Sequence, residues 1–552
     1  MLKKIIFIII ASYSTAVTAY NYQHSQTKVL KLIEAVDKKA KTKSEALLEI
    51  NEFDIEVLLK PSVIEGESAT VAFIGKPACT GAVSGVVCFE AHKLEEYRDK
   101  FGTVIWVTNH INNDDLCYLK YADAICAFKE DPSSHAIIVT RVNNVPCITL
   151  IDGAQLHANR IEFTSGTIQE GAIITIDAFN GKVYASAQKV TSPDSKKLIN
   201  TILSWSDENS KLSIHANADT AIEANAGLQF GAKGVDPRSE HMFFHPHSLK
   251  VFRKVILGRE NVDKSLEELK EIQRKDILQL MKTMGALPIK IRLLDPPLHE
   301  FLPEDSKQLK ILATELNIST AELKKTIDTL QEDNPMMGHR GVRLLLTFPE
   351  ILENQVLAIF EAAYDESLKD VAVNPVIIIP MVVHESEVIA IKKVISKVQK
   401  TLEQKYGRSI SYKVGVMIET PRACIIADKI APHVSYFSFG TNDLTGLTFA
   451  FSRGDVYKKF LKHYLDKSLL NNDPFSHLDT AVIRLMEMSV KKGRIANKNL
   501  RVGICGEQAS EKNGVFACHL LGLNSISCSP HRIPVVRLFA AQAAILHPSR
   551  KG

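Results

Sequence analysis

The sequence predicts an α/β protein in which a (β/α)8 barrel follows a smaller α/β domain. Strand-like and helix-like segments alternate from residue 211 onward, and two successive apolar runs end in carboxylates. A doubly wound sheet is the second choice, because no glycine-rich nucleotide fingerprint accompanies the strands. A chain of 552 residues is long enough for two or three domains.

The composition is that of an ordinary globular protein, with 45% hydrophobic and 24% charged residues. The 67 basic and 63 acidic residues give a net charge of +4, and no basic run with interleaved aromatic residues appears. Binding to nucleic acid is therefore not expected. Nine cysteines without a C-x-x-C pair argue against a disulfide framework and against a structural zinc site.

Residues 1–19 have the outline of a secretory signal peptide: two lysines, the run I-I-F-I-I-I-A and then V-T-A. The apolar run is too short to span a bilayer. The rest of the chain looks like a reduced metabolic enzyme, so we expect a cytoplasmic location, with export or membrane tethering as the alternative. Residues 20–68 are charged and helix-biased, and we expect them to form a connecting arm.

Residues 69–190 contain short β-branched segments separated by turn residues, which indicates a compact α/β domain. The segments are V-A-F-I, G-V-V-C-F, T-V-I-W-V, A-I-I-V-T-R, C-I-T-L and A-I-I-T-I. The polar run T-S-P-D-S-K-K at 191–197 favours a hinge, within a linker that covers residues 191–210.

Residues 211–552 alternate between strand and helix patterns, with helices such as 265–284 and 388–406. Eight such units fit a barrel with insertions. The predicted strands are 212–217, 234–238, 289–294, 341–345, 376–383, 414–419, 436–440 and 502–505.

Carboxylates end two of these strands. The run 414–418 stops at Glu419, and the run 436–439 stops at G-T-N-D, which includes Asp443. A buried parallel strand should be apolar throughout, so these carboxylates are not there for packing. Together they suggest a site for a hard cation such as Mg²⁺. The alternative is that Glu419 caps a helix over 422–430 and that Asp443 forms an Asx turn.

Other polar residues follow the predicted strands, and arginine forks suit phosphate and carboxylate oxygens. One arginine alone would be a surface ion pair, but three at strand ends favour an anion site. A thiol also lies at one of these strand ends. Most free cysteines are small buried hydrophobes, as we expect for Cys528. The polar residues are Arg238, Arg292, Asp295, Arg340, Asn442, Cys505 and Glu507.

At these positions the sequence resembles the pyruvate, phosphate dikinases of the phosphoenolpyruvate-utilising enzyme family. The run L-L-D-P-P-L-H-E separates it from phosphoenolpyruvate synthase and from enzyme I of the sugar phosphotransferase system, which would also need a helical docking insertion that is not visible here. The matching motifs are A-N-A-D-T (216–220), R-S-E-H-M-F-F (238–244), I-R-L-L-D-P-P-L-H-E-F-L-P (291–303), N-P-M-M-G-H-R-G (334–341), G-V-M-I-E-T-P-R-A, F-S-F-G-T-N-D-L-T, G-I-C-G-E (503–507) and S-C-S-P-H-R-I-P (527–534).

The resemblance, which begins near residue 74, implies phosphoryl transfer between a phosphohistidine and pyruvate, giving phosphoenolpyruvate reversibly. In S-S-H-A-I-I-V-T-R (133–141), His135 would carry the phosphoryl group on a domain that swings between two sites. Cys505 would protonate the enolate carbon, and Glu419 and Asp443 would hold Mg²⁺. The implied substrate contacts are Arg238, Arg292, Arg340, Glu419, Gly440, Thr441, Asn442 and Asp443. A homodimer is implied as well.

The sequence also departs from the family pattern. Only residues 1–68 precede the predicted histidine domain, too few for an ATP-binding domain, so we expect a separate protein to supply that step. Glu130 and Asp131 stand where two glycines are usual, and acidic groups repel a phosphoryl group. Gly446, Gln508 and Ala509-Ser510 are further differences. The rival hypothesis is therefore a non-catalytic remnant that binds phosphoenolpyruvate or docks on a full-length partner.

Overall fold

The computed structural model describes residues 22–64, 70–130, 135–191, 195–243, 246–257, 262–303, 306–316, 318–365, 368 and 370–548. The described part of the chain forms two compact units, residues 22–209 and residues 210–548, called here the N-terminal and the C-terminal unit. Residues 1–19, which carry the signal-like run, lie outside the described residues, as do 192–194 of the predicted hinge and Asp131.

Helices open the N-terminal unit, where the sequence predicted a connecting arm. The side chains of Thr42 and Asn51 each accept a hydrogen bond from the first turn of a helix, as N-caps do. The buried carboxylate of Asp54 is held by Ser25 at 3.0 Å and by Lys28 at 2.5 Å. These helices are α2 (Tyr22–Asp37), α3 (Lys43–Glu49) and α4 (Glu52–Leu59).

A closed seven-stranded barrel follows, in the order β10-β11-β2-β6-β5-β4-β3. Its strands β3 to β6 are parallel, and the remaining pairs are antiparallel. The strands are β2 (Val71–Cys79), β3 (Ala82–Cys88), β4 (Val104–Thr108), β5 (Ala124–Ala127), β6 (Cys147–Asp152), β10 (Ile173–Asp177) and β11 (Lys182–Tyr184). Five of the six predicted segments lie in these strands. The sixth, A-I-I-V-T-R, lies in helix α6 (His135–Val142) instead.

The rest of the N-terminal unit includes the helix that the linker forms and two small sheets. Residues 196–209 of the predicted linker form a helix whose apolar side, including Ile202 and Trp205, is buried. The remaining elements are β1 (Ser62–Ile64), which pairs with β12 (Lys189–Thr191), the small sheet of β7 (Ala154–Leu156), β8 (Arg160–Phe163) and β9 (Gly166–Gln169), and helices α5 (Leu94–Phe101) and α7 (Lys196–Asn209).

The C-terminal unit contains a curled sheet of seven parallel strands, in the order β13-β19-β18-β17-β16-β15-β14. Val235 forms single parallel bridges with Ala216 and with Ile289, which belong to the two edge strands. The strands are β13 (Ser213–Ala216), β14 (Ile289–Arg292), β15 (Pro375–Ile379), β16 (Lys413–Ile418), β17 (Tyr436–Gly440), β18 (Arg501–Cys505) and β19 (Ser525–Cys528).

One predicted strand of this unit is wrong. Residues 342–345 lie in helix α13 (Val342–Thr347) and Gly341 is its N-cap, because a short apolar run fits a buried helix as well as a strand. The predicted segment 234–238 contributes single bridges at Val235 and Arg238, and β19 went unpredicted.

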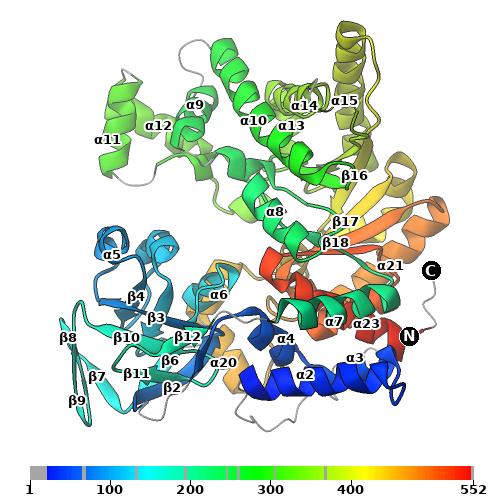
Figure 1. Ribbon diagram of the computed structural model, residues 1–552. Coiled ribbons are helices and arrows are strands. Elements are labelled where there is room, and N and C mark those ends of the chain that lie inside the picture. Colours follow the sequence, from blue (N-terminus) through cyan, green and yellow to red (C-terminus); the bar gives the residue numbers. More distant parts are fainter. Residues whose placement is uncertain are drawn as a thin grey trace. The chain divides into compact units, whose positions relative to one another are not determined.

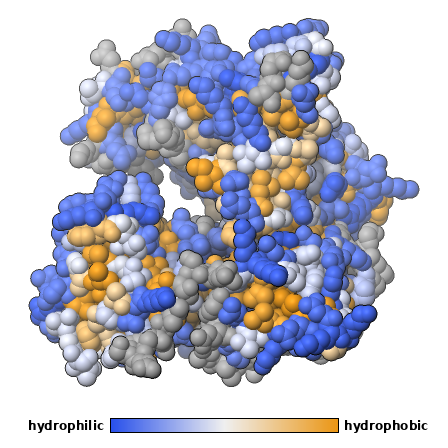
Figure 2. Space-filling view, viewed as in Figure 1, coloured by the Kyte–Doolittle hydropathy of each residue, from blue (hydrophilic) through white to orange (hydrophobic). Residues whose placement is uncertain are grey.

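Helices cover the outside of this sheet; α10, α14 and α15 lie in succession, each packed on the next (Figure 1). Among the described residues, no helix is both long and apolar enough to cross a membrane. On the face seen in Figure 2, hydrophilic residues predominate and hydrophobic ones form separate patches. The main helices are α8 (Ala221–Gln229), α9 (Pro246–Ile256), α10 (Val262–Met284), α11 (Ser306–Glu315), α12 (Thr320–Leu330), α14 (Pro349–Ala363), α15 (Glu385–Tyr406), α16 (Pro421–Ile425), α17 (Ala427–Ile430), α18 (Thr441–Phe449), α19 (Arg453–Lys459), α20 (Leu461–Asp466), α21 (Thr480–Ala496), α22 (Lys512–Leu520) and α23 (Ile533–Leu546).

Candidate functional site

Two neighbouring parallel strands bring Glu419 and the G-T-N-D segment to the edge of the sheet that the carboxyl ends of its strands form. Ile418 of β16 pairs with Phe439 of β17, so Glu419 and Gly440 follow side by side. A Cβ atom at Gly440 would overlap the Glu419 carboxylate, which explains why glycine ends β17. The carboxylate thus lies directly against the start of α18.

The Glu419 side chain is fully buried. Its Oε1 accepts a hydrogen bond of 2.6 Å from the Met381 backbone N–H, whereas its Oε2 has no partner among the described residues. The same holds for the buried Asn442 Oδ1. Burial raises the pKa of Glu419, the charges of Asp443 and Asp295 raise it further, and Arg340 and Arg292 oppose the change. A cation would relieve this cost.

Arg340 connects the carboxylates of this edge. Its Nη2 donates to Asp295 Oδ2 at 2.6 Å, and its Nη1 donates to Asp443 Oδ1 at 3.0 Å. Arg292, at the end of β14, contacts Glu240 and lies 3.5 Å from Asp295 Oδ2. Burial raises the pKa of Asp443, and Arg340 opposes it. The two guanidinium groups therefore share Asp295 beside the Glu419 carboxylate.

Arg238 has other partners. Its Nη2 donates to Asp219 Oδ2 at 2.9 Å, and the Asp219 carboxylate also lies 2.7 Å from His241 Nδ1. Burial would raise the pKa of Asp219, but the His241 hydrogen bond and the Arg238 charge hold it below its usual range. The Arg238 side chain is 45% exposed, and its backbone forms a parallel bridge with Arg292. It therefore lies on the rim with its outer side open.

Cys505 ends β18, paired in register with Gly440 of β17. Its Sγ accepts from the Ser438 hydroxyl at 3.9 Å and donates to the Phe439 carbonyl at 3.7 Å. The thiol is half-buried, unlike Cys528, which is buried as expected. Burial raises the pKa of Cys505, and Arg292 opposes it. The thiol is thus held mostly in its protonated form.

Thr441 does not point its hydroxyl toward open space. It is buried and donates to Gln508 Oε1 at 2.6 Å, while the Gln508 amide donates to the Pro474 carbonyl at 3.3 Å. Gln508, one of the residues that differ from the family pattern, therefore anchors the first turn of α18.

The alternative readings of the two carboxylates do not fit. Thr420, not Glu419, caps α16, accepting from the Ala423 N–H at 3.1 Å. Asp443 lies inside the first turn of α18. Within the described ranges, no group of three or more His, Cys, Asp or Glu side chains is arranged to hold a metal. The two carboxylates, with an unpartnered oxygen, could instead hold Mg²⁺ together with ligand oxygens.

The histidine segment lies in the N-terminal unit. His135 is the first residue of α6, where backbone N–H groups are exposed, and its side chain lies outside the described residues. Glu130 is 8% exposed, and its Oε2 accepts from the Ile111 N–H at 3.0 Å and lies 3.5 Å from His110 Nδ1. One of the two unfavourable acidic groups is therefore engaged within the domain.

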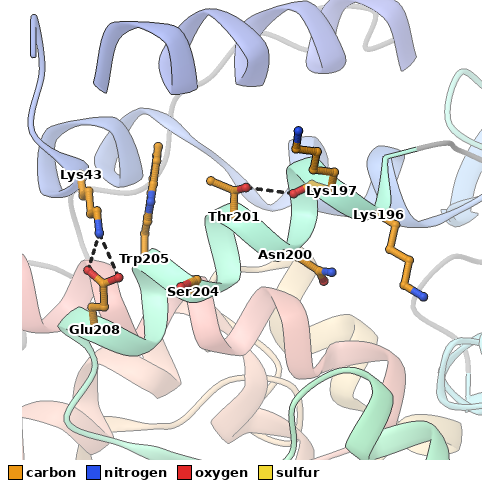
Figure 3. Close-up of a pocket in the computed structure, with 8 residues that line it drawn as sticks. All are labelled: Lys43, Lys196, Lys197, Asn200, Thr201, Ser204, Trp205 and Glu208. Carbon is orange, nitrogen blue, oxygen red and sulfur yellow. Dashed lines mark hydrogen bonds and ion pairs between the residues drawn. The ribbon is translucent and has the colours of Figure 1, made fainter. Parts of the chain in front are cut away.

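A pocket of about 670 Å³ lies elsewhere in the N-terminal unit, along α7 (Figure 3). Lys43 donates to both carboxylate oxygens of Glu208 at its rim, at 2.9 and 2.8 Å. Lys196 and Lys197 line its other end. None of the predicted site residues lies in it.

Sequence reasoning missed the partners that hold the arginines. Glu240 and Asp219 both lie within quoted motifs, R-S-E-H and A-N-A-D-T, so their positions were a usable signal. Their pairing with Arg292 and Arg238 joins segments 52 and 19 residues apart.

This parallel sheet carries guanidinium and carboxylate groups at the carboxyl ends of its strands, the edge at which α/β proteins bind their ligands. Residues 193–545 match the model described as "PEP-utilising enzyme, PEP-binding domain", and residues 102–181 match "PEP-utilising enzyme, mobile domain". The chain belongs to the phosphoenolpyruvate-utilising enzymes.

Its relatives include pyruvate, phosphate dikinases. The Rickettsia prowazekii enzyme is 36% identical over 93% of this chain and 59% of its own length. The Clostridium symbiosum enzyme is 36% identical over 92% and 59%, and the Giardia intestinalis enzyme 38% identical over 91% and 58%. The chain thus spans about three fifths of the length of these relatives.

Proposed function

We propose that this chain transfers a phosphoryl group between His135 and pyruvate, forming phosphoenolpyruvate reversibly, the pyruvate-side reaction of a pyruvate, phosphate dikinase. The observation that carries the proposal is the buried Glu419 carboxylate. Its unpartnered oxygen lies among Asp443, Asp295 and two arginines at one sheet edge. Carboxylates can bind a divalent cation and arginines can bind an anionic substrate, so these side chains together suit a ligand pair of this kind.

The finer fold assignment belongs to the same proposal. The curled sheet would close as a (β/α)8 barrel, with the segment around Val235 as the remaining strand, since Val235 bridges both edge strands. Residues 211–552 would bind phosphoenolpyruvate, and residues 69–190 would form the mobile phosphohistidine domain, which the two family matches support. A homodimer and a cytoplasmic location remain part of the proposal.

Each residue then has a role. Mg²⁺, held by Glu419 and Asp443, would neutralise charge that develops on substrate oxygens. Arg292 and Arg340 would bind the phosphoryl and carboxylate oxygens, with Arg238 joining from the rim. Gly440 and Thr441 would shape the site, and Asn442 would offer its amide.

The proton balance involves Cys505. When phosphoenolpyruvate gives its phosphoryl group to His135, the C3 carbon of the enolate takes the Cys505 proton and pyruvate forms. In the opposite direction the thiolate takes a methyl proton, and the enolate oxygen attacks the phosphorus of phospho-His135, breaking the P–N bond.

A second candidate is a non-catalytic protein that binds phosphoenolpyruvate or docks on a full-length partner. Glu130, which stands where the family resemblance leads us to expect glycine, favours it. Its carboxylate is nevertheless turned to the Ile111 N–H, which supports a competent histidine segment.

Phosphoenolpyruvate labelled with ³²P, incubated with Mg²⁺, separates the two candidates. The transferase should retain acid-labile, base-stable label, and His135→Ala should lose it. His110→Ala is the matched control and should keep the label. An unlabelled wild-type chain that still binds phosphoenolpyruvate would establish the second candidate.

A further inference from the structure

A charged cluster inside the C-terminal unit takes no part in the roles above. Lys290 precedes Arg292 by two residues on β14, so both point to the same face of the sheet. Its Nζ lies 2.5 Å from Asp236 Oδ2 and donates to Tyr436 Oη at 3.0 Å. Asp236 Oδ1 faces His215 Nδ1 at 3.0 Å. Lysine, aspartate and histidine are thus linked in the interior of the sheet.

The cluster lies directly beneath Cys505. The Ser527 hydroxyl donates to Asp236, and Ser527 is the register partner of Cys505. Tyr436, which accepts from Lys290, lies two residues before Ser438, the donor to Cys505. A Cβ atom at Gly503, two residues before Cys505, would overlap the Tyr436 hydroxyl. Each strand beside the thiol therefore carries one member of the cluster or a direct contact with it.

We propose that Asp236 is a positioning residue for Cys505: its carboxylate, fixed by Lys290, His215 and Ser527, keeps Cys505 a thiol that can donate its proton. The inference rests on the proposed function, in which that proton goes to the enolate carbon. Arg292 and Arg340 are placed to bind an anion, and a guanidinium near the sulfur favours the thiolate, which has no proton to give. The fixed negative charge of Asp236, which is joined through Ser527 to the strand beside Cys505, offsets this effect.

The electrostatics agree with the geometry. Burial raises the pKa of Cys505, Arg292 lowers it, Asp236 and Glu419 raise it, and the Ser438 hydrogen bond lowers it. Burial would raise the pKa of Asp236, but Lys290 and His215 lower it to about 2, so Asp236 is ionised at neutral pH. Burial lowers the pKa of His215, which leaves this imidazole neutral.

The test measures alkylation of Cys505 by iodoacetamide between pH 7 and 10, followed by mass spectrometry. Only the thiolate reacts, so below its pKa the rate rises about tenfold for each unit by which the pKa falls. Asp236→Asn should alkylate Cys505 several-fold faster than wild type at pH 8. Cys117, which is exposed in the N-terminal unit, is the internal standard and should not change. Asp177→Asn, another buried aspartate of that unit, is the matched control.

Asp236→Asn leaves Lys290 buried without its carboxylate, so the double variant Asp236→Asn/Lys290→Met provides a second measurement with no unpaired charge. It should also react faster than wild type, because the Asp236 charge, which raises the pKa of Cys505, is gone. A wild-type rate, or a slower one, in the folded variants overturns the inference. Alkylation needs no turnover, so label missing from wild-type His135 would overturn the proposed function and leave this result intact.

Discussion

Arg340 donates to carboxylates of two different segments, Asp295 and Asp443, through separate arms of one planar group. A lysine has a single ammonium and cannot reproduce this geometry. Arg340→Lys should therefore raise the phosphoenolpyruvate concentration needed for half-maximal labelling of His135 by about 10- to 100-fold, the loss of one or two charged hydrogen bonds.

Arg343→Lys is the matched control, because Arg343 follows closely in the chain, at the start of α13, and the hydrogen bonds that it donates to described residues go to the Met337 and Gly338 carbonyls. It should leave that concentration within about twofold. Equal effects of the two substitutions would show that Arg340 contributes charge alone or has no role.

Lys290 and Asp236 form a buried ion pair whose contribution to the free energy of unfolding depends on pH. Removing one partner leaves the other charge buried and unpaired, so Lys290→Met should lower the free energy of unfolding by about 3–5 kcal/mol at pH 7. The double variant with Asp236→Asn should lose less. Urea titrations that follow the C-terminal unit measure both.

The sign of the pH effect follows from the pKa of Asp236, lowered to about 2. The pair stabilises the fold above the unfolded pKa of about 4, and this contribution is lost as pH falls toward 2. In Lys290→Met the Asp236 carboxyl has lost its lysine partner and becomes protonated in acid. The loss of unfolding free energy caused by this substitution should therefore be smaller at pH 3 than at pH 7. An equal penalty at pH 3 and pH 7 would contradict the ion pair.

At the scale of elements, the strands that end at Glu419 and at G-T-N-D were predictable, because buried parallel strands are apolar and their polar ends stand out. β19 was not, because Ser525 and Ser527 turn hydroxyls toward the buried charges, so S-I-S-C lacks an apolar pattern. The run 341–345 was misassigned, since periodicity does not separate a short buried helix from a strand. The charge pairs join distant segments, which no local pattern encodes.

Gly341, which precedes α13 and follows Arg340, has φ +57°. A Cβ atom there would lie 2.8 Å from Met381 Cβ, whereas at Gly285, also with φ +57°, it would meet nothing within 4 Å. Gly285→Ala should cost about 1–2 kcal/mol of unfolding free energy, and Gly341→Ala about 1–3 kcal/mol more.

Met381 is also the residue whose N–H holds Glu419. Gly341→Ala should therefore weaken phosphoenolpyruvate binding as well, and Gly285→Ala should not. Denaturant unfolding and the half-maximal concentration for labelling measure the two effects. Identical costs at both glycines would contradict the close packing of this loop.

At the scale of the whole molecule, the two units have separate hydrophobic cores, which predicts two unfolding transitions. Both tryptophans of the chain, Trp106 and Trp205, lie in the N-terminal unit, so their fluorescence reports that unit alone. Phosphoenolpyruvate with Mg²⁺, at about 100 times its dissociation constant, should stabilise the C-terminal unit by about 2.7 kcal/mol.

Calorimetry should therefore show two unfolding transitions. The midpoint temperature of one should rise when the ligands are added, and that of the other, which matches the fluorescence transition, should stay constant. The His135→Ala variant should be used for these measurements, because it prevents phosphoryl transfer. Adding Glu419→Gln to this variant should abolish the rise in midpoint temperature. A ligand-dependent shift of the tryptophan transition would place the binding site in the other unit.

The central claim is that a divalent cation and phosphoenolpyruvate meet between Glu419, Asp443 and the arginines. Crystals of the His135→Ala variant grown with phosphoenolpyruvate and Mn²⁺ test it most directly, since manganese scatters anomalously and replaces magnesium. We predict one anomalous peak within coordination distance of carboxylate oxygens of Glu419 and Asp443, with the phosphate against Arg292 and Arg340. A peak elsewhere, or bound phosphoenolpyruvate with no metal between these two side chains, would contradict the account.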